Sequence, residues 1–116
     1  MKALFISPMI PSLNIKVTGK FFTDILGFST VMDAMEYAIF MKDNLSVHVL
    51  RAGSDIGQME FYMEVADIDL LWNSIKEKIT ALKHKEPFNR DYRMREIHIE
   101  IPQTKTLLII GQALAI

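Results

Sequence analysis

The feature that most constrains the fold is an internal repeat. The pattern strand, helix, strand, strand, strand occurs twice in the 116 residues, and Asn14 and Asp67 occupy the helix-capping place in each copy. One copy alone cannot bury both faces of its sheet. We therefore predict a single α+β domain over 1–116, built from paired βαβββ modules at about 1–53 and 57–112. The modules pair within one chain or by exchange between two chains.

In the first module, alternating apolar residues in Leu4–Ile10 predict a strand that Pro11 ends. Apolar residues then recur at steps of three and four, which predicts a helix over about 15–26, ended by Gly27. Gly19 inside this helix costs roughly 1 kcal/mol relative to alanine, so the helix needs tertiary packing. Three strands follow, at about 28–34, 36–42 and 45–51.

The second module begins with a strand in which Glu60, Tyr62 and Glu64 share one face. Asp67 then caps a helix with one apolar stripe, formed by Ile68, Leu71, Ile75 and Ile79. Strands are predicted near 83–88, 95–101 and 106–110. Alternation in the second of these places Ile97, Ile99 and Ile101 toward the core, and Glu96, His98 and Glu100 on the other face.

Charge and composition exclude several classes of function. The chain has 13 basic and 14 acidic residues with no long basic run, so we expect neither a nucleic-acid nor a membrane partner. It has no Cys, which excludes disulfides and thiolate metal sites. The first twelve residues contain one Lys and two prolines and fit neither a signal peptide nor a membrane span, so we expect a cytoplasmic protein.

Common catalytic motifs do not occur. The sequence has no Gly-rich phosphate loop, no Gly-x-Ser-x-Gly and no His-Glu-x-x-His. A cluster of Arg90, Tyr92, Arg93 and Arg95 offers an alternative site for a carboxylate or phosphate, against the plainer interpretation of solvated arginines.

Two segments carry a resemblance to a known family. They are Ser7-Pro8-Met9-Ile10-Pro11, followed by Asn14 and Phe21-Phe22-Thr23-Asp24-Ile25-Leu26-Gly27-Phe28, and later Asp91-Tyr92-Arg93-Met94-Arg95-Glu96-Ile97-His98. The chain resembles the glyoxalase/bleomycin resistance/extradiol dioxygenase (vicinal oxygen chelate) superfamily, in its bleomycin-resistance-like branch. The resemblance implies a curved mixed sheet with a concave cleft, helices on the convex face, and a homodimer.

The sequence also departs from the family pattern. Asn14 replaces the usual Asp, and Arg93 replaces a Gly. Ile101-Pro102-Gln103-Thr104 stands where the family has Asp-Pro-Asp-Gly. The last turn therefore lacks the glycine that normally relieves a positive φ.

Metal-using members of the superfamily place four ligands on the concave face, and the matched positions in this chain are Ser7, His48, Glu60 and Leu108. Only His48 and Glu60 suit a divalent ion, so we predict no metal and no other cofactor. His98 leaves an alternative open, because convergence of His48, Glu60 and His98 would form a two-histidine, one-carboxylate set that suits Fe(II).

We therefore predict a metal-independent binding protein that holds an aromatic or cationic small molecule. Its cleft is predicted to contain Ser7, Met9, His48, Glu60, Tyr62, His98 and Leu108, and no catalytic residue is assigned. The alternative is a metal-dependent enzyme of the same superfamily, a glyoxalase-like lyase or isomerase or a dioxygenase.

Overall fold

The chain divides into two compact units, each built around one four-stranded sheet. The computed structural model describes residues 1–115. The first unit comprises Met1–Gly57 with Pro102–Thr104, and the second comprises Gln58–Ile101 with the described residues from Lys105 onward. Each unit has the predicted order of a strand, a helical segment and three strands, so the α+β class and the two βαβββ modules are confirmed.

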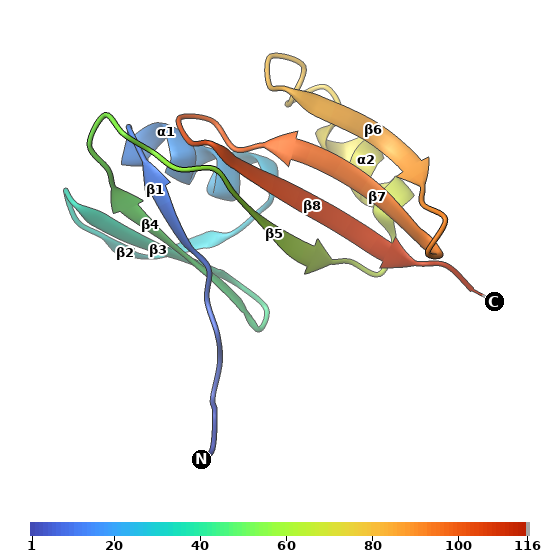
Figure 1. The fold of residues 1–116 in the computed structure, drawn as a ribbon, viewed down its shortest axis with the longest axis horizontal. Coiled ribbons are helices and arrows are strands. Elements are labelled where there is room, and N and C mark those ends of the chain that lie inside the picture. The colour runs from blue at the N-terminus through green and yellow to red at the C-terminus, as the bar shows by residue number, and fades with distance from the viewer. Residues whose placement is uncertain (116) are drawn as a thin grey trace. The chain divides into compact units, whose positions relative to one another are not determined.

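The first unit has two consecutive helical segments against its sheet (Figure 1). Its elements are β1 Met9–Ser12, α1 Ile15–Lys20, η1 Phe21–Ile25, β2 Ser29–Asp33, β3 Tyr37–Lys42 and β4 Leu45–Arg51. The strand order is β1-β4-β3-β2, with β1 parallel to β4 and the other pairs antiparallel. The side chain of Asn14 accepts a hydrogen bond from the Val17 amide at 3.2 Å, which confirms the predicted cap.

The second unit repeats this topology. Its elements are β5 Met59–Glu64, α2 Ile68–Ile75, β6 His84–Asn89, β7 Met94–Glu100 and β8 Thr106–Ala113. The order is β5-β8-β7-β6, with β5 parallel to β8, and α2 lies behind these strands in Figure 1. Asp67 accepts a hydrogen bond from the Leu70 amide at 3.1 Å, as predicted.

Each unit has its own apolar core on the helix-covered face of its sheet. In the first unit, Phe22 packs edge-on against Phe21 and Phe28 and stacks on Phe40. The second core consists of fully buried aliphatic side chains, which include Ile68, Ile75, Ile79, Ile97, Ile99, Leu108 and Ile110. Of the helix residues that we expected to pack on the sheets, Phe22 and Ile75 are buried, whereas Ile25 and Leu71 are half-buried.

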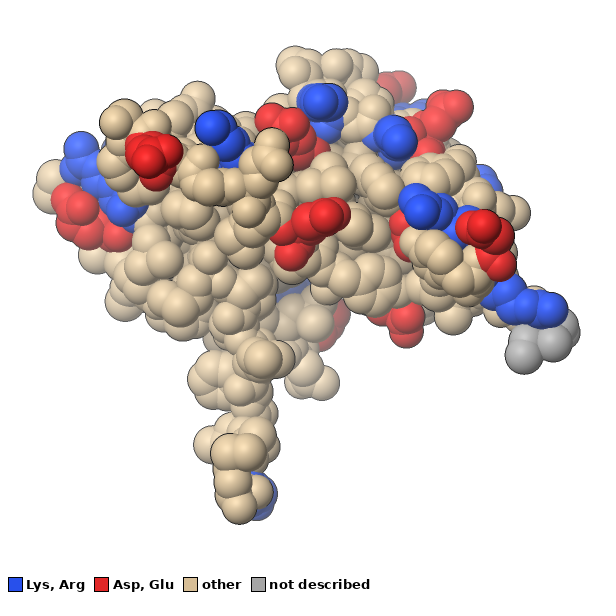
Figure 2. Space-filling model, viewed as in Figure 1, with Lys and Arg blue, Asp and Glu red and all other residues tan. Residues whose placement is uncertain are grey.

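The predicted N-terminal strand is wrong at both ends. Residues 1–8 form no strand, and Leu4 and Ile6 are 79% and 94% exposed. Residues 1–6 extend away from the first sheet (Figure 1), and Figure 2 shows this end of the chain as mostly uncharged. Strand β1 instead begins at Met9 and runs through Pro11. Proline fits at this position because β1 is an edge strand, where a missing N–H costs no ladder hydrogen bond.

The helices also differ in detail from the expectation. The first is α-helical only to Lys20 and continues as one π-helical segment, before Gly27 ends it with a φ of 77°. Helix α2 ends at Ile75, four residues before the end of the predicted stripe. Ile79 is still fully buried, because the turns after α2 keep it against the core.

Two departures from the family pattern lie at strained backbone positions. Arg93 and Gln103 have φ values of 63° and 65°, in the left-handed region that favours glycine. The turn at 101–104 therefore has a positive φ without a glycine, but at Gln103, one residue before Thr104, which stands in the place of the family's glycine.

Candidate functional site on the second sheet

The face of the second sheet opposite α2, which we call the open face, carries an apolar strip between acidic residues. The strip lies on β8 and consists of Leu107, Ile109 and Gly111. Strand register places Glu60, Tyr62 and Glu64 of β5 beside it on one side, and Glu100, His98 and Glu96 of β7 beside it on the other. Predicted site residues Glu60, Tyr62 and His98 therefore share one face.

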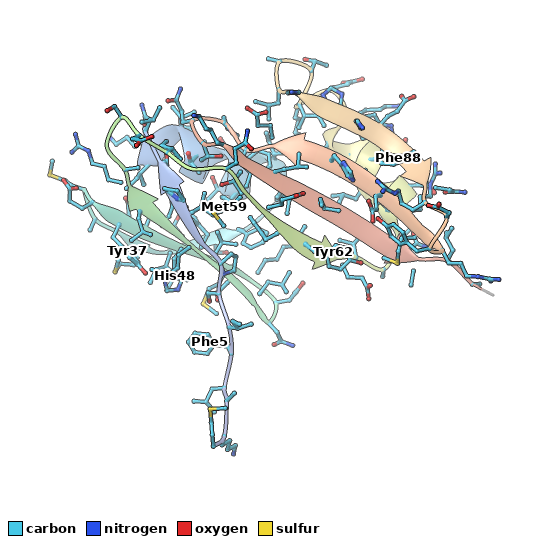
Figure 3. All side chains as sticks on the ribbon, in the orientation of Figure 1. Phe5, Tyr37, His48, Met59, Tyr62 and Phe88 are labelled. Carbon is cyan, nitrogen blue, oxygen red and sulfur yellow. The ribbon has the colours of Figure 1, made fainter. Side chains whose placement is uncertain are left out.

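Aromatic side chains stand toward both edges of this face. Tyr62 on β5 and Phe88 on β6 come from the two edge strands of the sheet (Figure 3). A β-carbon at Gly111 would lie 2.7 Å from Cε2 of Tyr62, so the missing side chain is what allows the Tyr62 ring to lie over β8.

One end of the open face is hollowed into a pocket of about 600 Å³. Its lining includes Glu60, Glu100, His98 and Leu107. The rest of its lining is Gln58, Met59, Lys83, His84, Lys85 and Lys105. This volume suits a small organic molecule, and Met59 and Leu107 are the apolar residues among the polar and charged groups that line it.

A buried carboxylate organises the neighbouring part of the open face. Glu96 is only 3% exposed. Its Oε1 accepts a hydrogen bond from Nε2 of His98 at 2.9 Å, and its Oε2 accepts one from the Tyr92 hydroxyl at 2.6 Å. The Arg90 guanidinium lies 3.7 Å from Oε1 and over the rings of Phe88 and Tyr92. Both carboxylate oxygens of Glu96 therefore have hydrogen-bond partners, which is what a buried charged group requires.

The pKa values of three groups on or beside the open face, Glu96, Tyr92 and Tyr62, are shifted. Burial acts to raise the pKa of Glu96, but the hydrogen bonds from Tyr92 and His98 and the charge of Arg90 outweigh it, so the pKa is lowered. The hydrogen bond to Glu96 raises the pKa of the Tyr92 hydroxyl. Burial, together with a 2.8 Å hydrogen bond to Glu64, raises the pKa of Tyr62 to about 12. Both tyrosines are therefore neutral hydrogen-bond donors at neutral pH.

Acid should remove the contribution of Glu96 to stability. Its folded-state pKa is lowered, so this contribution is present above the unfolded-state value and is lost as the pH falls through the folded-state value. We expect the free energy of unfolding of Glu96→Gln to fall less than that of the wild type between neutral pH and about pH 3, as measured by urea unfolding.

Tyr92→Phe provides the matched variant, because it removes only the hydrogen bond to Oε2. Its acid dependence should lie between those of the wild type and Glu96→Gln. Identical pH dependence in all three proteins would contradict the assigned role of Glu96.

The remaining predicted residues of the first module lie on the helix-free face of the first sheet. Ser7 hydrogen-bonds Ser46, and Met9 pairs with His48 across β1 and β4. His48 also bonds the Tyr37 hydroxyl through Nδ1, with the two rings edge to face (Figure 3). These polar groups therefore already have partners within the first unit.

Leu108 was assigned to the cleft wrongly. It is 1% exposed and pairs with Phe61 and Ile99, which places it on the helix-covered face. Its neighbours Leu107 and Ile109 occupy the open face instead. The sequence signal for them is weak, because residues 107–110 are all apolar and show no alternation. Glu100 was predicted on this face but was not assigned to the site, and Phe88 was missed.

The residues at the family's metal positions do not fit a metal ion. Among residues 1–115, no three His, Cys, Asp or Glu side chains are grouped so that they could hold one. Ser7 and His48 are engaged by Ser46 and Tyr37, and Leu108 has no donor atom. These positions therefore support no chemical step through a metal.

The arginine cluster is not assembled around an anion site. Arg95 contacts Asp69 at 3.0 Å and Asn89 at 2.9 Å, and Arg90 lies next to Glu96. Two of its members are therefore occupied by acceptors of the protein itself.

Within the part of the chain that the structure describes, no helix has the length and hydropathy needed to cross a membrane.

The arrangement of the elements matches solved structures over almost the whole chain. A bleomycin resistance determinant encoded on transposon Tn5 superposes with a TM-score of 0.82 at 18% identity, covering 96% of this chain and 98% of that one. The chain has the glyoxalase/bleomycin resistance fold. The bleomycin-binding protein of Streptomyces verticillus, solved with copper(II)-bleomycin, gives 0.74 at 15% identity, with 100% and 99% covered.

Enzymes share this glyoxalase/bleomycin resistance fold. Lactoylglutathione lyase from Agrobacterium tumefaciens gives a TM-score of 0.77 at 12% identity, covering 96% of this chain and 94% of that one. The sequence itself matches no family profile and no curated protein. At these identities the likeness establishes the fold, while the function has to be argued from the site.

Proposed function

We propose that the protein binds a small aromatic cation on the open face of the second sheet, without a metal ion. The observation that carries this proposal is the apolar strip of β8 between carboxylates on β5 and β7. An apolar floor suits a flat ring, and carboxylates beside it suit a positive charge. The bleomycin-binding proteins of this fold support the proposal, since they hold a small molecule.

Glu60 and Glu100 are the acidic anchors of the proposed site. Both pair with Leu107, so they flank the same point of the strip, and both line the pocket. Tyr62 stands next to Glu60 on this face and offers a ring for cation–π contact. The assignment of Ser7, Met9 and His48 to the same cleft stays a prediction.

Three lysines of the pocket lining repel a cationic ligand, so the decisive test compares ligands of opposite charge. Lys83, Lys85 and Lys105 line the pocket. Nζ of Lys85 lies 5.8 Å from the centroid of the Phe88 ring, and the long stems of Lys83 and Lys105 let their ammonium groups turn to solvent. We therefore place the cation beside Glu60 and Glu100, over the strip.

The test compares three naphthalene probes of different charge by fluorescence titration. Naphthylmethyl-trimethylammonium should bind more tightly than neutral naphthylmethanol or anionic naphthylacetate. Glu60→Gln and Glu100→Gln should each weaken cation binding roughly two- to fivefold, as expected for a partly solvated charge, and leave naphthylmethanol unchanged.

Glu77→Gln is the matched control, since Glu77 is exposed and lies outside the sheet and the pocket. It should bind all three probes as the wild type does. Tighter binding of naphthylacetate than of the cation would assign the pocket to anions and refute the proposal.

We also propose that the protein is a homodimer. Supporting this are apolar side chains exposed in the single chain, among them Leu4, Phe5 and Ile6 of the N-terminal segment and Met9 and Met41 on the helix-free face of the first sheet. Sedimentation at micromolar concentration should report twice the chain mass of 13.3 kDa. A mass of one chain at all concentrations tested would refute the dimer.

A further inference from the structure

We propose that the aromatic cation bound by the open face is a protonated amine that donates an N–H hydrogen bond to Nδ1 of His98. This inference rests on the proposed function and names the class of cation that the same site selects. Primary, secondary and tertiary ammonium groups carry such a donor, and quaternary ammonium groups do not.

The first step concerns which nitrogen of His98 carries the proton. Glu96 is held ionised by its surroundings, and an ionised carboxylate only accepts hydrogen bonds. The 2.9 Å contact between Oε1 and Nε2 therefore requires the hydrogen to sit on Nε2 of His98. A neutral imidazole has one such hydrogen, so Nδ1 is left with a lone pair and is an acceptor.

The second step concerns how firmly this arrangement is held. The other carboxylate oxygen of Glu96 is occupied by Tyr92, so Glu96 cannot easily turn away from His98. The rings of Phe88 and His98 pack edge to face, with centroids 5.0 Å apart. Only 13% of the His98 side chain is exposed. Glu96 is thus a positioning residue that fixes the His98 tautomer and ring orientation.

The third step concerns the hydrogen-bond partner of Nδ1 of His98. His98 lines the pocket, and the hydrogen bond that the structure gives its imidazole joins Nε2 to Glu96, which leaves Nδ1 for water or a ligand. A ligand that displaces this water without supplying a donor leaves an acceptor unpaired, which lowers its affinity. A protonated amine replaces the lost hydrogen bond, whereas a quaternary ammonium presents methyl groups.

The experiment compares naphthylmethylammonium with its trimethylammonium analogue at about pH 8, where a histidine is ordinarily neutral. Both probes have the same ring and the same charge. In the wild type, the N–H probe should bind roughly three- to tenfold more tightly, the range expected for one hydrogen bond. His98→Phe keeps an aromatic ring and should bring this ratio close to one.

Glu96→Gln tests the positioning role separately. It should reduce the ratio between the two probes, and nitrogen NMR of His98 should show loss of the pure Nε2–H tautomer that the wild type displays. A merely structural role of Glu96 would weaken both probes equally and leave the tautomer unchanged. Melting temperatures of both variants establish that they are folded, and Glu77→Gln should keep the wild-type ratio.

The outcomes separate the inference from the proposed function. If neither probe binds, the proposed function fails. If both bind the wild type equally, the function stands and the inference is refuted. A preference for the N–H probe that persists in His98→Phe also refutes the inference, since another acceptor would then receive the donor.

Discussion

Replacing Phe22 by alanine should lower the free energy of unfolding by about 3–5 kcal/mol, the range for removing a buried phenylalanine. Phe22 is 1% exposed and touches three other rings, with centroids 5.2 Å from Phe21, 5.5 Å from Phe28 and 5.8 Å from Phe40. The helical segment and the sheet meet at this side chain, so the space left by its ring cannot collapse readily.

Urea unfolding followed by circular dichroism and by fluorescence measures this effect. Trp72, the single tryptophan, lies on α2, so its fluorescence reports the second unit while circular dichroism reports both. Leu70→Ala is the control, because Leu70 is 68% exposed and should change stability by less than about 0.5 kcal/mol. A loss below about 1 kcal/mol for Phe22→Ala would contradict the described packing.

The elements that the sequence predicted well are those with local causes. Asn14 and Asp67 cap their helices through their own side chains, and the amides that they satisfy belong to Val17 and Leu70, within the first turn of each helix. Alternation in Met94–Glu100 places Ile97 and Ile99 in the core because each strand residue points opposite to its neighbours. Such signals need no knowledge of distant segments.

The N-terminal strand shows where local signals stop. Leu4–Ile10 alternates like a strand, but a strand also requires a partner. The parallel pairing of β1 with β4 starts only at Met9 opposite His48. Before Met9, the Pro8 carbonyl still accepts a hydrogen bond from the His48 amide at 3.0 Å, but residues 1–8 form no strand, and this cannot be read from their own pattern.

The candidate site was predictable in part. Alternation correctly grouped Glu60 with Tyr62, and His98 with Glu100. Residues 107–110 are all apolar, so their pattern does not show on which face of the sheet Leu108 lies. The burial of Glu96 depends on Tyr92 and Arg90, which come from the turn before β7. The backbone of that turn has a positive φ at Arg93, and no periodic pattern in the sequence predicts such a turn.

Replacing Gly19 by alanine should destabilise the protein by about 1–2 kcal/mol, although helix propensity alone favours alanine by roughly 1 kcal/mol. The added β-carbon would lie 2.8 Å from Cζ and 3.4 Å from Cε1 of Phe40. Phe40 is 4% exposed and stacks on Phe22, so its ring has no free space into which it can move. Overpacking therefore outweighs the gain in propensity.

A double-mutant cycle with Phe40→Leu tests this cause directly, with the free energy of unfolding as the readout. Leucine is smaller than phenylalanine and lacks the ring atoms that meet the new methyl group, so Gly19→Ala should cost much less, or become stabilising, in the Phe40→Leu background. If helix propensity alone decided the outcome, Gly19→Ala would be stabilising in both backgrounds. Equal costs in both backgrounds would show that the ring is not what excludes a side chain at this position, and that another contact of α1 sets the requirement for glycine.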